Sequence, residues 1–201
     1  MDHARSGGGP AAARLKRREV VPALLHNRGD LLVVSGLGSA CYDAFAAGDH
    51  PRNFYLWGAM GSAAMIGLGL ALAQPEHRVL VITGDGEMLM GMGSLATIGV
   101  QQPANLTVAV LDNAHYSETG MQQSHTSAGT SLRAVAAGCG IGGAIDIHTM
   151  QEVAALRDQI HRGAGPILAC IHVSPEEDPR VLPSRDGVYL KLRFREQLGF
   201  K

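Results

Sequence analysis

Two apolar segments that each end in an oxygen-bearing side chain constrain the fold of this chain more than any other feature. Residues 78–86 (RVLVITGDG) carry Asp85 near their end, and residues 106–113 (LTVAVLDN) end in Asn113. Each segment has the composition of a buried strand, and residues 87–102 between them are expected to form a helix. A strand–helix–strand crossover is right-handed and places its two strands parallel in one sheet. The carboxyl ends of both strands then face one crevice, where open α/β sheets bind ligands.

The rest of the chain alternates between short apolar segments and segments with helical periodicity. This alternation predicts an α/β fold, namely a single three-layer domain with a mostly parallel sheet and helices on both faces. The further strands are expected at residues 31–34, 53–57, 142–147 and 167–173. The further helices are expected at residues 14–28, 40–47, 58–73, 131–138, 150–162 and 188–198, and residues 114–130 are expected to be irregular.

The length of the chain, 201 residues, suits one domain with a hydrophobic core of its own. Residues 1–13 are rich in Gly and Ala, and we expect them to form a disordered tail. Residues 14–175 are expected to form the domain. Residues 176–201 are expected to be a C-terminal extension that packs on this domain or on a partner chain.

Composition excludes several classes of partner and site. The formal net charge of −1 predicts neither a nucleic-acid partner nor a membrane surface. The longest apolar stretch, residues 59–73, is shorter than the ~20 residues that a membrane span requires. Cys41, Cys139 and Cys170 form no CxxC pair, which argues against a zinc or iron–sulfur site. Reduced, buried thiols fit a cytoplasmic location.

The tripeptide Gly84–Gly86 suggests an anion site with a cation beside it. A strand, a Gly turn and a helix N-terminus present free amides to a phosphate. Asp85 would repel that phosphate unless a cation lay between them. The side-chain oxygens of Asp85 and Asn113 are hard ligands of the kind that hold Mg²⁺ together with substrate phosphates. On this pattern alone, an ordinary Asp-Gly turn at a strand end is an equally good interpretation.

Two motifs together resemble the thiamine-diphosphate-dependent enzymes. Gly84–Gly86 followed by Asn113 resembles their GDG…N motif. Residues 57–61 (WGAMG) resemble the segment that holds the cofactor's aminopyrimidine ring, with Met60 at the position of the bulky apolar residue that supports the bent cofactor. The same resemblance gives the carbonyl at Gly58 a hydrogen bond from the cofactor's amino group. It implies aminopyrimidine contacts from Gly58, Ala59 and Met60.

Longer stretches are similar to the diphosphate-binding subunit of sulfopyruvate decarboxylases and to phosphonopyruvate decarboxylases. They are residues 53–61, 66–69 and 119–126, and the resemblance covers roughly residues 30–175. The sequence departs from the family at Met121, where a second Gly is expected in a TGGQ-like string. Because this loop lies beside the reacting centre in such enzymes, the departure leaves the substrate open.

The resemblance also implies specific ligands for the cofactor. Thiamine diphosphate would be bound with Mg²⁺, which Asp85, Asn113 and the carbonyl of His115 would hold. The ends of the β-strands and the turns that follow them would bind the diphosphate. The residues implied there are Ser39 with the turn at residues 36–38, Gly84, the amides of Gly86 and Glu87, and Asn113. For Ser39, a role confined to the turn is the alternative.

Three residues of the loop after Asn113 are candidates for proton transfer or for contact with a substrate anion. They are His115, His125 and Glu118, the last being the only acid in this loop. Histidine and carboxylate side chains are the usual general acids and bases. The alternatives are a loop His bonded to the backbone and a solvated Glu.

One required group is missing from the sequence. In this family a carboxylate, usually Glu, activates the aminopyrimidine from a second, pyrimidine-binding domain. A domain takes ~100–200 residues, so this chain holds only the diphosphate-binding half. The resemblance therefore implies a hetero-oligomer with a dimeric core, in which a pyrimidine-binding (alpha) subunit supplies the Glu.

The function implied is decarboxylation of a 2-oxo acid, with a sulfopyruvate-like substrate whose far end is a sulfonate or phosphonate. Carboligation, as in acetolactate-synthase-like enzymes, is a second outcome of the same chemistry. A non-catalytic cofactor-binding module is a third interpretation. A nucleotide-binding Rossmann domain is disfavoured, because Gly36-Leu-Gly38 continues into Ser39 and Cys41 without completing a GxGxxG motif.

Overall fold

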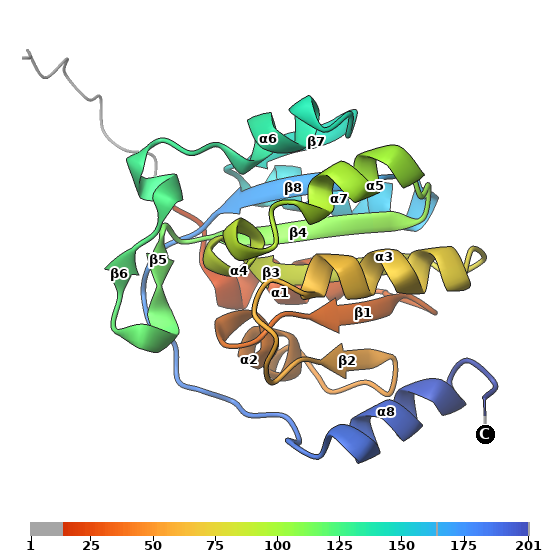
Figure 1. Cartoon of the computed structure of the whole chain (residues 1–201). Helices are drawn as coiled ribbons and strands as arrows, with labels where there is room; N and C mark the ends of the chain where they lie inside the picture. Colours follow the sequence, from red (N-terminus) through yellow and green to blue (C-terminus); the bar gives the residue numbers. More distant parts are fainter. Residues whose placement is uncertain (1–13, 164, 201) are drawn as a thin grey trace, which may run out of the picture.

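The computed structural model describes residues 14–163 and 165–200, so the tail expected at residues 1–13 lies outside the described residues. Six parallel strands form one sheet in the order β2-β1-β3-β4-β8-β7 (Figure 1). The strands are β1 (Leu32–Ser35), β2 (Asn53–Tyr55), β3 (Val79–Gly84), β4 (Leu106–Asp112), β7 (Gly143–Ile147) and β8 (Ile167–His172). The predicted α/β fold with a mostly parallel sheet is thus confirmed.

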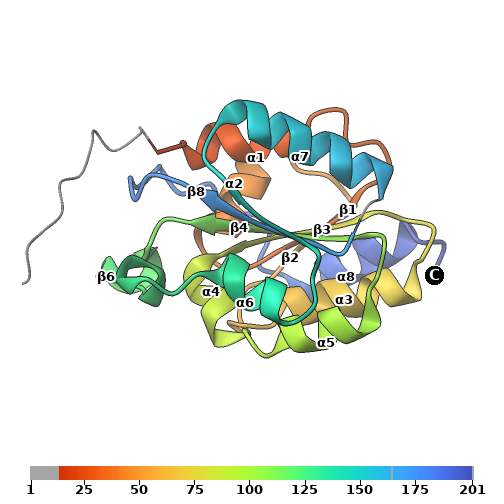
Figure 2. The ribbon, with the colours of Figure 1, turned by 90° about the horizontal axis from the view of Figure 1, so that it is seen from above.

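Helices cover both faces of this sheet, as Figures 1 and 2 show. One layer consists of α1 (Arg17–Leu25), α2 (Ser39–Ala46) and α7 (Met150–Arg162). The other consists of α3 (Ala63–Ala73), α4 (Asp85–Met90), α5 (Ser94–Gln101) and α6 (Leu132–Gly138). Successive side chains of a strand point to opposite faces, so Val33 packs in the first core and Val34 in the second. Because both faces are covered, β4 is buried throughout and reads as a continuous apolar run.

Strand order explains where a ligand can bind. The chain leaves β1 toward β2 on one side and returns to β3 on the other, so the direction of winding changes between β1 and β3. Ligands of open α/β sheets bind outside the carboxyl ends of the strands at such a point. β3 and β4 are direct neighbours, with Gly84 opposite Leu111. Asp85 and Asn113, which follow these strands, therefore lie at the same edge.

The segment predicted as one helix at residues 87–102 forms two, α4 and α5, with a break at Gly91–Gly93. At Gly91, an added Cβ would lie 2.1 Å from the carbonyl oxygen of Gly61. The loop before α3 therefore packs directly on the backbone where α4 ends. This contact joins residues far apart in sequence, so helical periodicity could not predict the break.

Two other expected elements also differ from the structure. α3 begins at Ala63 rather than at residue 58, because Ala59 and Gly61 have φ values of 56° and 94°, which a right-handed helix does not allow. Residues 114–130 are more regular than expected. They hold a short antiparallel hairpin, β5 (His115–Tyr116) and β6 (Gln122–Gln123), with the 3₁₀ turns η1 (Ser117–Thr119) and η2 (His125–Ala128).

The last helix, α8 (Gly187–Glu196), lies along the sheet edge formed by β2. Leu190 and Phe194 on this helix are buried, and Phe194 packs edge-on against Phe54 of β2 with ring centroids 5.6 Å apart. Within residues 14–163 and 165–200, no helix combines the length and the hydropathy needed to span a membrane.

Candidate active site

A cavity of about 370 Å³ lies at the carboxyl ends of β1, β3 and β4. Its walls come from the β1–α2 turn, the loop before α3, the β3–α4 turn and the hairpin after β4. The sequence-predicted site residues on these walls are Ser39, Met60, Gly84, Asp85, Gly86, Glu87, Asn113, His115 and Glu118. Four segments that are far apart in the chain thus bring these residues to one place.

Three predicted site residues do not line the cavity. Gly58 and Ala59 are exposed in the loop before Met60, which is itself 36% exposed. His125 is exposed at the start of η2. The end of the cavity at Met60 is therefore open to solvent in this chain.

Asp85 is a buried carboxylate, 1% exposed, at the start of α4. The hydroxyl groups of Ser124 and Thr126 donate hydrogen bonds to its Oδ2, the Thr126 bond being 3.2 Å long. Among the described residues, no Lys, Arg or His lies within ion-pair distance of Asp85. Burial raises the pKa of Asp85, and the charge of Asp112 nearby raises it further. A buried carboxylate without a cationic partner favours binding of a cation.

Asn113, which follows β4, is held in a fixed orientation. Its Oδ1 accepts a hydrogen bond from the amide of His115 at 2.9 Å, and its Nδ2 donates to Ser117 Oγ at 2.9 Å. His115 Nδ1 lies 2.9 Å from the carbonyl oxygen of Asn113. In the described part of the chain, no three His, Cys, Asp or Glu side chains gather as a metal site. A cation here would depend on amide, carbonyl and phosphate oxygens beside the single carboxylate of Asp85.

The buried side chain of Glu87 lines the cavity and links three of its walls. Its carboxylate accepts hydrogen bonds from Thr83 Oγ1 at 2.9 Å and from the amide of Ala63 at 3.3 Å. The amides of Gly61 and Leu37 also donate to it. Burial raises the pKa of Glu87, whereas these donors, which favour the ionised form, lower it. We find that the side chain of Glu87 ties together the β1–α2 turn, the loop before α3 and β3, a role that the sequence did not indicate.

We expect Glu87→Gln to destabilise the fold by about 1–3 kcal/mol, because the amide NH₂ would face backbone donors in a buried site. Cofactor affinity should fall by about tenfold, because the loop that carries Met60 and the β1–α2 turn would both lose their hydrogen bonds to the Glu87 carboxylate. Urea unfolding and titration of the fluorescence of Trp57, the only tryptophan, measure the two effects. Glu76→Gln, at an exposed position, is the matched control. Equal stability of the two variants would show that the Glu87 contacts contribute little.

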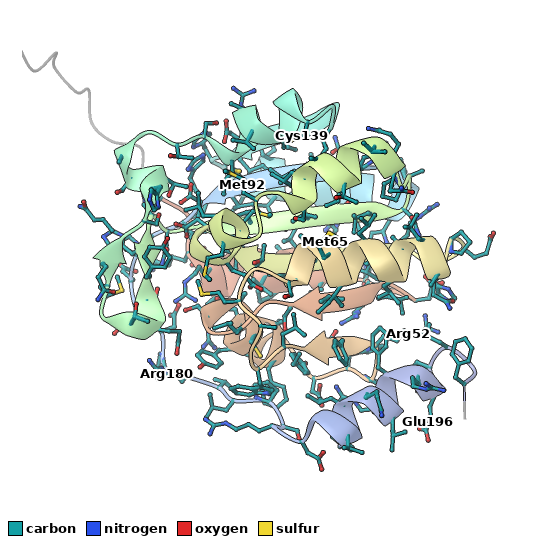
Figure 3. The ribbon with its side chains drawn as sticks, viewed as in Figure 1. Arg52, Met65, Met92, Cys139, Arg180 and Glu196 are labelled. Atoms are coloured by element: carbon teal, nitrogen blue, oxygen red, sulfur yellow. The ribbon has the colours of Figure 1, made fainter. Side chains whose placement is uncertain are left out.

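Glu118 lies at the rim of the cavity against residues of the C-terminal extension. Tyr42 donates a hydrogen bond of 3.3 Å to its Oε2, and Arg180 Nη2 lies 3.7 Å from the same atom. A hydrogen bond also holds the extension near this site, because Trp57 Nε1 donates to the carbonyl of Ser184 at 2.6 Å. Figure 3 places Arg180 on the segment that leads to α8. The extension therefore adds a cationic side chain beside the site.

Arg17, Met90 and Tyr116 also line the cavity, although the sequence did not indicate them as site residues. Arg17 is 6% exposed and is paired with the buried Asp43 at 2.5 Å. It comes from α1, and nothing in the pattern around it indicates a site. Met121 adopts a left-handed conformation with φ of 61°, where the Gly expected from the resemblance would be unstrained.

The chain matches a family model and several known proteins. The family model described as thiamine pyrophosphate enzyme, C-terminal TPP binding domain, matches residues 37–173. The chain is 42% identical over 127 residues to sulfopyruvate decarboxylase subunit beta of Methanocaldococcus jannaschii, covering 63% of this chain and 67% of that protein. It is 39% identical over 171 residues to phosphonopyruvate decarboxylase of Streptomyces viridochromogenes, covering 83% of this chain but only 42% of that protein.

The fold is also found among solved structures. Benzoylformate decarboxylase from Polynucleobacter necessarius superimposes with a TM-score of 0.69 at 16% identity. The match covers 87% of this chain and 36% of that one. At this identity the likeness bears on the fold alone. It agrees with the single α/β domain described above.

Proposed function

The chain belongs to the thiamine pyrophosphate enzymes, and on that basis we propose that it is the diphosphate- and Mg²⁺-binding subunit of a two-subunit 2-oxo acid decarboxylase. Its membership confirms the resemblance that the GDG…N and WGAMG motifs indicated. The chain carries the cofactor-binding domain of the family over residues 37–173. Its decarboxylase relatives support the type of reaction.

The observation that carries the proposal is the uncompensated carboxylate of Asp85 beside Asn113, at the ends of neighbouring strands. Asp85, Asn113 and the carbonyl of His115 would hold Mg²⁺, whose charge would offset the burial of Asp85 and the charge of a diphosphate. Ser39, Gly84, Gly86 and the amide of Glu87 would line the diphosphate. Gly58, Ala59 and Met60 would hold the aminopyrimidine. The cofactor, when bound, supplies the nucleophilic carbon and the electron sink for decarboxylation.

The chain's own side chains would orient the substrate and handle protons. Glu118, hydrogen-bonded to Tyr42, would hold or accept a proton at its free oxygen at the cavity rim. His115 and His125 would serve as further proton donors or anion contacts. A 2-oxo acid with a second anionic group, like the sulfonate or phosphonate in the substrates that the relatives' names indicate, would find Arg180 at the rim.

A partner chain would supply the activating carboxylate. The cavity's carboxylates are Asp85, Glu87 and Glu118. The first is held by hydroxyl groups and the second by backbone amides, and Glu118 lies near Tyr42 and Arg180 rather than at the open Met60 end. The similar Methanocaldococcus protein is named subunit beta, and the Streptomyces enzyme is a chain more than twice as long as the matched part. Both observations support a pyrimidine-binding (alpha) partner.

We expect the purified chain alone to show no decarboxylation of sulfopyruvate or phosphonopyruvate, because the described residues place no carboxylate at the Met60 end of its cavity. Addition of a pyrimidine-binding subunit should restore activity by several orders of magnitude. Release of CO₂ in a coupled assay measures both. Calorimetry with thiamine diphosphate and Mg²⁺, against NAD as control, tests cofactor binding separately. Full activity of the chain alone would contradict the two-subunit proposal, and binding of NAD instead would contradict the cofactor assignment.

A further inference from the structure

A buried carboxylate outside the cavity wall connects the two halves of the proposed cation site. Asp85 stands at the start of α4, whereas Asn113 belongs to the segment after β4. Asp112, the last residue of β4, is 6% exposed and does not line the cavity. Its Oδ1 accepts two hydrogen bonds, one from the amide of Ala114 at 3.0 Å and one from the hydroxyl of Thr126 at 2.8 Å. Each of these donors leads to one half of the site.

The first contact holds a backbone conformation that its residue type disfavours. Ala114 is buried and has a φ of 64°, in the left-handed region that residues with a Cβ rarely adopt. Its amide donates to Asp112 Oδ1, and its carbonyl accepts a hydrogen bond from the amide of Ser124 at 2.9 Å. The proposed ligands Asn113 and His115 lie directly on either side of it. Strained backbone of this kind persists only where its surroundings determine it, and it is typical of functional sites.

The second contact reaches Asp85. Thr126 Oγ1 lies 2.8 Å from Asp112 Oδ1 and 3.2 Å from Asp85 Oδ2, so one hydroxyl bridges the two buried carboxylates. The hydroxyl of Ser124 also bonds to Asp85 and lies 2.9 Å from Thr126 Oγ1. Within residues 14–163 and 165–200, neither carboxylate has a Lys or Arg at ion-pair distance. The orientation of Asp85 thus depends on hydroxyl groups, and Asp112 fixes one of them.

A histidine faces the other oxygen of Asp112. His172, at the end of β8, places its Nδ1 3.7 Å from Asp112 Oδ2 and its Nε2 3.1 Å from Asp146 Oδ1. The same ring stacks on that of His148, with centroids 4.4 Å apart. Both oxygens of the Asp112 carboxylate therefore have neighbours that restrict its rotation, as the support of a ligand set requires.

We propose that Asp112 is a positioning residue of the cation site. The amide of Ala114 transmits its position to Asn113, and the hydroxyl of Thr126 transmits it to Asp85. This inference rests on the proposed cation site, because it concerns the orientation of the ligands assigned there. Loss of a partner that orients metal ligands typically lowers metal affinity by about 10–100-fold. Asp112 itself touches neither the metal nor the cofactor.

Titration of the purified full chain with Mn²⁺ in the presence of thiamine diphosphate, followed by electron paramagnetic resonance, tests this inference. Mn²⁺ is a spectroscopic probe that prefers the same oxygen ligands as Mg²⁺. We expect Asp112→Ala to weaken Mn²⁺ binding by about tenfold or more and to change the line shape of the bound ion. Asp112→Asn keeps an oxygen acceptor for both donors, so it should recover most of the lost affinity.

Variants of Thr126 test the link to Asp85 separately. Thr126→Val removes the bridging hydroxyl and should weaken Mn²⁺ binding by about threefold or more, whereas Thr126→Ser keeps the hydroxyl and should bind as the wild type does. Thr130→Val, in the same loop, is the matched control. Thermal unfolding of each variant shows that it is folded, and the Thr126 variants decide the question if Asp112→Ala is not.

Hydrogen exchange of the cofactor-free chain, measured by NMR, tests the network without any metal. The amide of Ala114 donates to Asp112, so it should exchange about tenfold or more faster in Asp112→Ala than in the wild type. Asp112→Asn should keep most of the protection, because its side-chain oxygen can still accept this hydrogen bond.

Three results would overturn the inference. They are wild-type Mn²⁺ affinity and line shape in both Asp112→Ala and Thr126→Val, an Asp112→Asn chain that binds Mn²⁺ no better than Asp112→Ala, and unchanged exchange at Ala114 in Asp112→Ala. Failure of the proposed function looks different. In that case the wild-type chain binds no Mn²⁺ with thiamine diphosphate, or Asp85→Asn binds it as tightly as the wild type.

Discussion

Replacing Asp85 by Asn is expected to abolish Mg²⁺-dependent binding of thiamine diphosphate, with a loss of affinity of about 100-fold or more. The same variant should make the cofactor-free chain more stable, by about 1 kcal/mol at neutral pH. Asn keeps the shape of the side chain and can still accept the hydrogen bonds of Ser124 and Thr126. It removes a buried charge that has no cationic partner among the described residues. Binding and stability should therefore change in opposite directions.

The pH dependence of stability gives a second signature of Asp85. Because its pKa is raised in the folded chain, the folded state binds the proton more tightly than the unfolded state does. The contribution of Asp85 to stability is therefore greatest at acidic pH and is lost as the pH rises through the raised pKa. Asp85→Asn should flatten this part of the profile, and Glu87 and Asp43, whose pKa values burial also raises, should contribute to the slope that remains.

Calorimetric titration with thiamine diphosphate and Mg²⁺, and urea unfolding between acidic and neutral pH, measure these effects. Asp146→Asn is the control. Asp146 lies on β7, away from the cavity wall, and contacts Arg133 and His172 of neighbouring elements. Retained cofactor affinity in Asp85→Asn would exclude Asp85 as a metal ligand. A loss of stability in the cofactor-free variant would show that the ionised carboxylate is compensated in the chain by contacts other than those described.

The second large effect is expected for Gly91→Ala. The new Cβ would lie 2.1 Å from the carbonyl oxygen of Gly61. This oxygen is a backbone atom, so it can move away from the Cβ only if the loop before α3 moves with it. We expect a loss of about 1–3 kcal/mol in the free energy of unfolding. Cofactor affinity should fall as well, because displacement of Gly61 moves the loop that carries Met60.

Gly93→Ala is the matched control for this prediction. It lies in the same break between α4 and α5, its φ is −59°, and an added Cβ there meets nothing within 4 Å. Ala at such a position should stabilise the chain by about 0.4–1 kcal/mol. Thermal unfolding measures the stability of both variants, and titration of Trp57 fluorescence measures their cofactor affinity. If both variants behave alike, the contact between Gly61 and Gly91 does not hold the loop in place.

The arrangement at the strand ends could be predicted because it depends on regularities that are local or general. Two apolar runs separated by a helical segment are expected to lie parallel, because a helical crossover returns the chain to the same end of the sheet. The sequence alone therefore predicts that Asp85 and Asn113 lie at one edge of the sheet. The break between α4 and α5 could not be predicted, since it depends on the distant Gly61. The same holds for the hairpin at β5 and β6.

The sequence by itself determined the fold class, the edge of the sheet that carries the site and the family to which the chain belongs. Apolar periodicity and the two motifs are properties of neighbouring residues, and these need no tertiary contact to be recognised. Only the tertiary structure decided that the Glu87 side chain accepts a hydrogen bond from the backbone amide of Ala63, and that Arg180 of the extension lies 3.7 Å from Glu118. Each of these depends on contacts between segments that are far apart in the chain, which no local pattern encodes.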